Sequence, residues 1–170
     1  HDLFGAKEYC EGDYVCWSTP VEDLSDWRYE GVIFKKQDTP WNTKNLSYYA
    51  PDVVRGTDGR YYLYYSVANT SITSVAVCDK PAGKYQYLGD VHFPDGRVYG
   101  SKPDDWFMFD PAVLVDDDGR VFLYVGSGQK SNGQFGHEIK GLFVMELSSD
   151  MLTIISEPTI IMPADFNPKK

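Results

Sequence analysis

One aspartate combines a reactive side chain with an unusual setting. Asp110 precedes Pro111 and follows the aromatic stretch Trp106–Phe109. The surrounding segment occurs a second time 60 residues earlier, and there Ala50 takes the place of the aspartate, before Pro51. A carboxylate among aromatic side chains is typical of an active-site acid. Since the other copy has a neutral residue, we expect Asp110 to have a chemical role; an aspartate that only caps the turn before proline is the alternative.

The repeated segment itself predicts a pair of strands. It covers residues 50–66 and 110–126, and the triplet Asp-Gly-Arg at 58–60 recurs at 118–120. The Asp-Gly pair predicts a type I′ hairpin turn, which needs positive φ at both central positions. Runs of β-branched and aromatic residues on either side predict strands. Each copy is therefore expected to be a strand, a tight turn and a strand.

Two further strands are predicted after each hairpin. They lie at Ser74–Cys78 and Tyr85–Val91 in the first copy, and at Gly141–Leu147 and Leu152–Ile155 in the second. The hairpin strands are apolar on both faces, which indicates inner strands that are covered from both sides. Four antiparallel strands repeated at this spacing predict the blades of a β-propeller.

We therefore predict an all-β fold, a β-propeller of four-stranded antiparallel blades, with about two and a half blades in this chain. Residues 14–18 and 31–34 match the third and fourth strands of an earlier blade. The predicted divisions are 1–36 for the remainder of blade 1, 37–95 for blade 2 and 96–170 for blade 3. Because a propeller must close into a ring, we expect a segment of a larger protein whose exposed blade edges favour self-association.

Composition limits the classes of partner. The 170 residues carry a formal net charge of −9, which argues against nucleic acid, whose phosphates need a basic surface, and against an anionic membrane. No apolar run reaches the length of a membrane span. The three cysteines, Cys10, Cys16 and Cys78, are odd in number and lack metal-type spacing. This count slightly favours a reducing, cytoplasmic compartment over a secreted one.

The motifs around the repeat resemble a known family. The segment Phe109–Tyr124, with its Asp-Pro pair and hairpin, resembles the central motif of glycoside hydrolase family 43. Residues 49–53 resemble the second-blade motif of that family, in which tryptophan often replaces Tyr49, and residues 17–27 resemble its first-blade signature. The resemblance covers essentially the whole chain and implies a five-bladed propeller. Fructan-active and invertase-like five-bladed enzymes share parts of the pattern.

The resemblance implies inverting hydrolysis of arabinofuranosyl or xylosyl linkages in plant-type glycans. That family uses a general base, a general acid, and an aspartate that orients the acid and tunes its pKa; Asp110 matches the tuning aspartate. A nearby like charge raises the pKa of the acid, and inversion needs room for a water molecule between acid and base. The repeat period places the base before His1 and the acid beyond Lys170, so we expect the chain alone to be inactive.

Other carboxylates are weaker candidates. Asp2 follows His1, and the resemblance to arabinan-active members makes it a candidate for lining the site. Asp52 follows Pro51 but is off the Asp110 position, so we expect it to face elsewhere. Glu138 stands in a polar loop and is expected to be solvated rather than to act as the acid.

We predict no metal and no cofactor. Asp116 and Asp117 precede a glycine turn, as in some cation-binding loops, but we expect them to form a solvated hairpin tip. His92 and His137 stand alone in the sequence, without the spacing of metal ligands.

Tryptophans supply candidate sugar-binding surfaces, because aromatic rings pack against the apolar faces of sugars. Trp41 and Trp106 stand in the loops that lead to the second and third inner strands. We predict both as platforms for the expected partner, an arabinose- or xylose-containing oligosaccharide, with loop anchoring as the alternative. Trp17 and Trp27 are expected in the core, and the tyrosines within residues 61–65 are expected to pack between blades.

Two other functions stay open. A propeller that only binds carbohydrate, or that has a structural role, would lack the three carboxylates even in the intact protein. A fructan-active relative would have a nucleophilic aspartate upstream and an acidic glutamate near a cysteine downstream.

Overall fold

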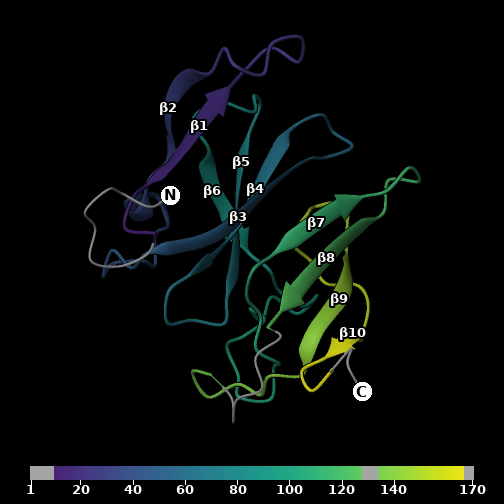
Figure 1. Cartoon of the computed structure of the whole chain (residues 1–170). Helices are drawn as coiled ribbons and strands as arrows, with labels where there is room; N and C mark the ends of the chain where they lie inside the picture. The colour runs from purple at the N-terminus through teal and green to yellow at the C-terminus, as the bar shows by residue number, and fades with distance from the viewer. Residues whose placement is uncertain (1–9, 128–133, 167–170) are drawn as a thin grey trace.

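The computed structural model describes residues 10–127 and 134–166, and strands dominate these residues (Figure 1). The strands are β1 (Tyr14–Ser18), β2 (Arg28–Phe34), β3 (Tyr48–Arg55), β4 (Tyr61–Val67), β5 (Thr73–Cys78), β6 (Gln86–Asp90), β7 (Ala112–Val115), β8 (Val121–Gly126), β9 (Gly141–Leu147) and β10 (Thr159–Pro163), with one short 3₁₀ helix, η1 (Lys36–Asp38). No helix among the described residues is long and apolar enough to cross a membrane.

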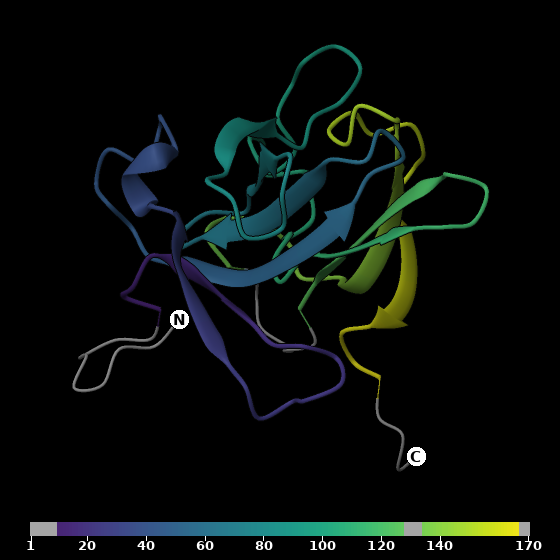
Figure 2. The same ribbon diagram turned by 90° about the horizontal axis from the view of Figure 1, so that it is seen from above.

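The strands form three antiparallel sheets. The first has two strands, β1-β2, and the other two have four strands each, in the orders β3-β4-β5-β6 and β7-β8-β9-β10. We call them the first, middle and third sheets. A four-stranded antiparallel meander is the blade of a propeller. Figure 2 shows the β1–β2 and β7–β8 hairpins projecting in different directions from the middle sheet. The predicted all-β propeller fold, with about two and a half blades in this chain, is confirmed.

Strand β4 packs against both neighbouring sheets, because successive side chains of a strand point to opposite faces. Tyr62 and Tyr64 lie in a buried cluster with residues of β8 and β9. Leu63 and Tyr65 lie in a second buried cluster with residues of β1 and β2. None of the four side chains is more than 2% exposed. The prediction that these tyrosines pack between blades is confirmed.

The hairpin tips differ from the predicted type I′ turn. Gly59 has a φ of +84°, but Asp58 is not among the residues with positive φ. The Gly56 amide donates to the Arg60 carbonyl at 2.8 Å, and the Gly59 amide donates to the Gly56 carbonyl at 3.0 Å. These bonds define a three-residue loop in which a type I turn ends in a left-handed glycine. The same two bonds recur at residues 116–120, so one glycine per loop suffices.

The fourth strand of the third sheet begins later than predicted. The predicted strand at 152–155 does not form; β10, at Thr159–Pro163, pairs with β9 instead. Thr153 forms an isolated bridge with His92, and Ile154 forms one with Leu147. Because Ile154 is only 2% exposed, this segment fills the interface between the middle and third sheets rather than extending an edge. Tertiary packing therefore overrides the local strand signal.

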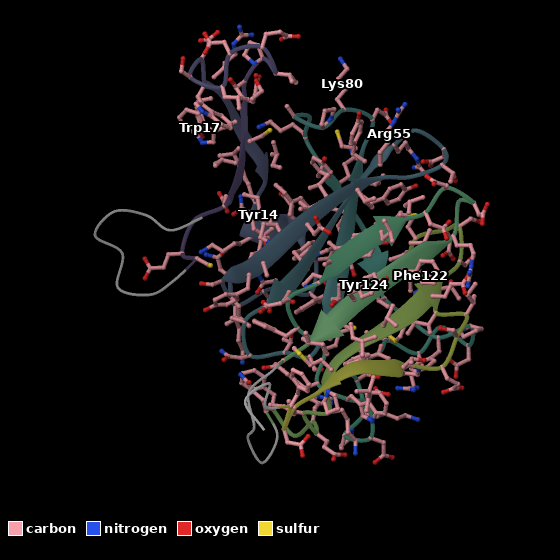
Figure 3. The ribbon with its side chains drawn as sticks, turned by 45° about the vertical axis from the view of Figure 1, so that its right-hand side comes forward. Tyr14, Trp17, Arg55, Lys80, Phe122 and Tyr124 are labelled. Carbon is pink, nitrogen blue, oxygen red and sulfur yellow. The ribbon has the colours of Figure 1, made fainter. Side chains whose placement is uncertain are left out.

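The expectation that Trp17 and Trp27 belong to the core is wrong. Their side chains are 50% and 58% exposed. Cys16 packs against the cluster between the first and middle sheets, so its neighbour Trp17 points to the opposite face of β1 (Figure 3). On that face the Trp17 ring contacts Tyr29, with 4.9 Å between ring centroids.

Candidate active site

Asp110 lies two residues before β7, at the start of the inner strand of the third sheet. Its side chain is exposed and borders a cavity of about 420 Å³ between the ends of the strands. The lining residues come from β7, β8, β9, β10 and the adjoining turns: Asp110, Ala112, Tyr124, Val125, Gly126, Ser127, Leu142 and Ile161. The cavity wall is thus mostly apolar, with the carboxylate at its edge.

Desolvation raises the pKa of the Asp110 carboxyl above its ordinary value. The side chain faces solvent on one side, while the apolar cavity wall excludes water from the other. Among the described residues, no positive charge or hydrogen-bond donor offsets this loss of water. Loss of water therefore makes the charged form of this carboxyl less favourable than that of an aspartate in water, and shifted pKa values of this kind are frequent at functional sites.

The backbone at Asp110 has the left-handed conformation that non-glycine residues rarely adopt. Its φ is +50°, and Ala50, at the equivalent place in the middle sheet, has a φ of +44°. The carbonyl of Phe109 accepts a hydrogen bond from the Gly126 amide at 2.9 Å, which ties the residue before Asp110 to the end of β8. Since alanine adopts the same conformation, the repeated scaffold fixes the geometry, and only the third sheet presents a carboxylate there.

An aromatic pair adjoins this backbone. The rings of Tyr49 and Phe109 lie 5.7 Å apart between centroids, and Phe109 also stacks on Phe107 at 5.6 Å. Neither Tyr49 nor Phe109 is selected as a site residue from the sequence. The sequence does contain a pattern that points to this pair, because the repeat alignment places an aromatic residue before both position 50 and position 110.

The structure uses the two predicted sugar platforms in packing. The indole of Trp41 donates to the Asp90 carboxylate at 3.1 Å, and Trp106 contacts Phe143 edge to face, with 5.4 Å between centroids. Both tryptophans are partly exposed, and neither is among the described residues that line the Asp110 cavity. These contacts are those of loop anchoring. A sugar-binding role for either tryptophan stays a prediction.

Asp2 lies outside the described residues. Among the described residues that line the Asp110 cavity there is no second carboxylate. Glu138 forms an ion pair with Lys140 at 2.7 Å, and its side chain is 64% exposed. Asp116 accepts hydrogen bonds from two backbone amides of its own hairpin tip. Asp52 accepts hydrogen bonds from backbone amides of β3 and β7.

The histidines are held by local hydrogen bonds. Nδ1 of His137 donates to the Asp105 carbonyl at 3.0 Å, and Nδ1 of His92 donates to the Asp90 carbonyl at 2.9 Å. Within residues 10–127 and 134–166, no group of three or more His, Cys, Asp or Glu side chains could hold a metal ion.

The fold and the site together define a propeller that presents a desolvated carboxylate at the start of an inner strand. The model of the family "Glycosyl hydrolases family 43" matches residues 12–169. The chain therefore belongs to glycosyl hydrolase family 43.

Named relatives and solved structures agree with this assignment. A xylosidase/arabinosidase of Thermoclostridium stercorarium is 49% identical over 169 residues, which are 97% of this chain and 34% of that protein. An extracellular exo-alpha-(1->5)-L-arabinofuranosidase of Cellvibrio japonicus is 34% identical over 119 residues, 62% of this chain and 33% of that protein. The structure of an alpha-L-arabinofuranosidase from Clostridium thermocellum matches with a TM-score of 0.64 and 27% identity, over 94% of this chain and 48% of that one. The chain thus spans between about a third and a half of the length of these relatives.

Proposed function

We propose that the protein containing this chain hydrolyses arabinofuranosyl or xylosyl linkages in plant-type glycans with inversion, and that Asp110 orients the general acid and tunes its pKa. Family membership and the names of the relatives support the reaction class. One observation supports the role of Asp110: a carboxyl with a raised pKa stands at the edge of a cavity, in a backbone geometry that the middle sheet repeats with alanine.

The proposed role follows from electrostatics. In an inverting hydrolysis, the acid protonates the leaving oxygen while the base activates a water molecule on the opposite face of the sugar. The acid must stay protonated near neutral pH, and a second carboxylate close to it raises its pKa because two like charges resist sharing one site. The Asp110 carboxylate supplies that charge, and the scaffold holds it in place.

We also propose that the 170-residue chain alone does not turn over substrate, because it spans only between about a third and a half of the length of its relatives and Asp110 is the one carboxylate among the described residues that line the cavity. Apolar side chains on the outer faces support a related proposal, that these faces pack against further polypeptide, including a second copy of the chain. The exposed residues include Trp17, Tyr29, Leu114, Ile160 and Ile161. Light scattering at high concentration tests self-association, and a clean monomer would contradict it.

Hydrolysis of an aryl α-L-arabinofuranoside and an aryl β-D-xyloside tests the reaction. The full-length natural protein is expected to release the aryl group, with inversion of the anomeric centre followed by NMR. Asp110→Asn should lower kcat by about 100-fold or more, since positioned acid–base groups contribute on the order of 10²–10⁴ in rate. Asp117→Asn, the same change at an exposed hairpin tip, is the control and should leave kcat unchanged.

Three outcomes would contradict the proposal. A wild-type kcat in the Asp110→Asn protein would show that Asp110 neither orients the general acid nor tunes its pKa. Binding of arabino- or xylo-oligosaccharides by the full-length protein without any hydrolysis would favour a carbohydrate-binding propeller instead. Turnover by residues 1–170 alone, abolished by Asp110→Ala, would show that the chain holds its own acid and base.

A further inference from the structure

We infer that Asp52 is a positioning residue for Asp110: from the middle sheet, it binds the backbone of β7, the strand that follows Asp110. The inference rests on the proposed function of Asp110, which it deepens by naming the side chain that holds the strand in place.

The contact joins two strands that do not pair in any sheet. Oδ2 of Asp52 accepts a hydrogen bond from the Val113 amide at 2.7 Å, and Oδ1 accepts one from the Val53 amide at 2.9 Å. Val53 belongs to β3 and Val113 belongs to β7, three residues after Asp110. A carboxylate that accepts two backbone amides forms short, charge-assisted bonds, which are about twice as strong as neutral ones.

The Val113 amide needs such an acceptor. Strand β7 is the edge strand of the third sheet and pairs only with β8 in the described structure. Edge strands leave part of their amides without a strand partner, and a partly buried amide without a partner is costly. Asp52 supplies that partner from the neighbouring sheet, so the inner strands of two blades are linked at this point.

The two copies of the repeat place their carboxylates on opposite sides of the same proline. The middle sheet has Ala50-Pro51-Asp52, and the third sheet has Asp110-Pro111-Ala112. The pairing of β3 with β4 has an irregularity between Tyr49 and Asp52, and such bulges redirect side chains. The middle sheet thus presents a carboxylate that holds its neighbour, whereas the third sheet presents one that faces the cavity.

Two hydrogen bonds bracket Asp110. On its N-terminal side the Phe109 carbonyl is bound by the Gly126 amide at 2.9 Å, and on its C-terminal side the Val113 amide is bound by Asp52 at 2.7 Å. A non-glycine residue keeps a φ of +50° only where its surroundings over-determine it. Removal of one anchor should let the start of β7 move, and a misplacement of about 1 Å can cost about 100-fold in rate.

Two variants separate the hydrogen bond from the charge of Asp52. Asp52→Ala removes both acceptors, whereas Asp52→Asn removes the charge but keeps one acceptor oxygen for Val113. In the full-length protein, NMR measures hydrogen exchange of the Val113 amide and the pKa of the Asp110 carboxyl. We expect Asp52→Ala to speed the exchange by about 10-fold or more, which is the effect of losing about 1.4 kcal/mol of protection, and to shift the Asp110 pKa. Asp52→Asn should lie between Asp52→Ala and wild type in both, because it keeps one acceptor oxygen for Val113 but loses the charge and the second acceptor.

In the full-length protein, Asp52→Ala should lower kcat by about 10- to 100-fold with little change in KM, and should move the pH profile of kcat. Asp52→Asn should lose less of the rate than Asp52→Ala, because it keeps one acceptor oxygen for Val113. Asp116→Ala is the matched control, because Asp116 also accepts two backbone amides, but only within its own hairpin tip. It should alter stability without changing kcat or the Asp110 pKa.

The readouts decide the inference separately from the proposed function. Unchanged Val113 exchange and an unchanged Asp110 pKa in Asp52→Ala would overturn the positioning role, even in an active enzyme. Equal losses of kcat in Asp52→Ala and Asp52→Asn would assign the effect to charge and also overturn it. If no variant of the full-length protein hydrolyses either glycoside, the proposed function fails, while the NMR measurements still decide the role of Asp52. If Asp52→Ala does not fold, Asp52→Glu, which displaces the acceptor by one methylene, takes its place with the same expected losses.

Discussion

The middle and third sheets are built from the same repeated segment, but their equivalent residues have different surroundings. Tyr64 on β4 is fully buried, and its hydroxyl donates to the Met151 carbonyl at 2.6 Å. Tyr124, at the same place on β8 (Figure 3), is only partly buried and lines the Asp110 cavity. The strand sets which face a side chain points to, and the neighbouring sheet decides whether that face becomes core or cavity wall.

The backbone at the starts of the two inner strands is also the same, although the side chains there differ. Positions 50 and 110 share a left-handed φ, so the scaffold keeps its shape while the side chain changes from methyl to carboxylate. The Asp110 carboxylate borders the cavity of the third sheet, and Ala50 places a methyl group at the equivalent position of the middle sheet. The repeat therefore supplies the same backbone frame in both sheets, and the change from alanine to aspartate gives only the third sheet a carboxylate at this position.

The largest effect on stability is expected when Gly126 in the third sheet is replaced by serine, the residue at the equivalent position of the middle sheet. Gly126 is equivalent to Ser66 in the repeat. Its φ is +127°, and a Cβ there would overlap the carbonyl oxygen of Gly141. Gly126→Ser should lower the free energy of unfolding by more than about 3 kcal/mol, because backbone strain and overpacking add. Urea denaturation measures this loss.

Ser66→Ala, at the equivalent position of the middle sheet, is the control. The Ser66 hydroxyl is buried and has no hydrogen-bond partner in the described structure, so Ser66→Ala should change the free energy of unfolding by less than about 1 kcal/mol or even raise it. A Gly126→Ser protein as stable as wild type would contradict the steric difference that the structure shows between the two sheets at this position.

A smaller effect on stability is expected to distinguish Tyr64 from Tyr124. Tyr64→Phe leaves the Met151 carbonyl without its donor in a buried interface, so we expect a loss of about 1 kcal/mol in the free energy of unfolding. Tyr124→Phe, the matched change on β8, should stay within about 0.5 kcal/mol of wild type. Urea denaturation of both variants checks this difference. Equal losses would mean that Tyr124 is as buried as its counterpart.

Local signals in the sequence were sufficient for the blades, and they singled out Asp110 as a candidate site residue. The repeat located the hairpin strands. The apolar run at residues 61–65 correctly indicated a strand covered from both faces, whereas the same prediction is wrong for β7, in which Leu114 is 48% exposed. Asp110 stood out because its counterpart is alanine. These features depend on residues close in the chain or on a comparison of the two copies, so no knowledge of distant contacts was needed.

The remaining features depend on contacts between distant parts of the chain. The segment around Ile154 looks like a strand, but it is buried against the middle sheet, and no local pattern distinguishes the two outcomes. Trp17 is exposed because of the face of β1 on which it falls. The acceptor role of Asp52 needs the bulge in β3 and the open edge of β7 together, and neither is visible in the residues alone.

The smallest expected effect concerns the charge that distinguishes Asp110 from Ala50. Burial raises the pKa of Asp110 in the folded state above its ordinary value, which is about 3.9 in the unfolded chain. Between these two pKa values the folded protein binds more protons than the unfolded chain, so its stability falls as pH rises through that window. Asp110→Asn removes this titration: the variant should match wild type below the window and exceed it above, by a few tenths of a kcal/mol because solvent screens the exposed side of the carboxylate. Urea midpoints from about pH 3 to about pH 7 measure the difference, and Asp117→Asn should show no such rise. A difference between Asp110→Asn and wild type that stayed constant with pH, or that favoured wild type at neutral pH, would show that the cavity wall does not disfavour the charge.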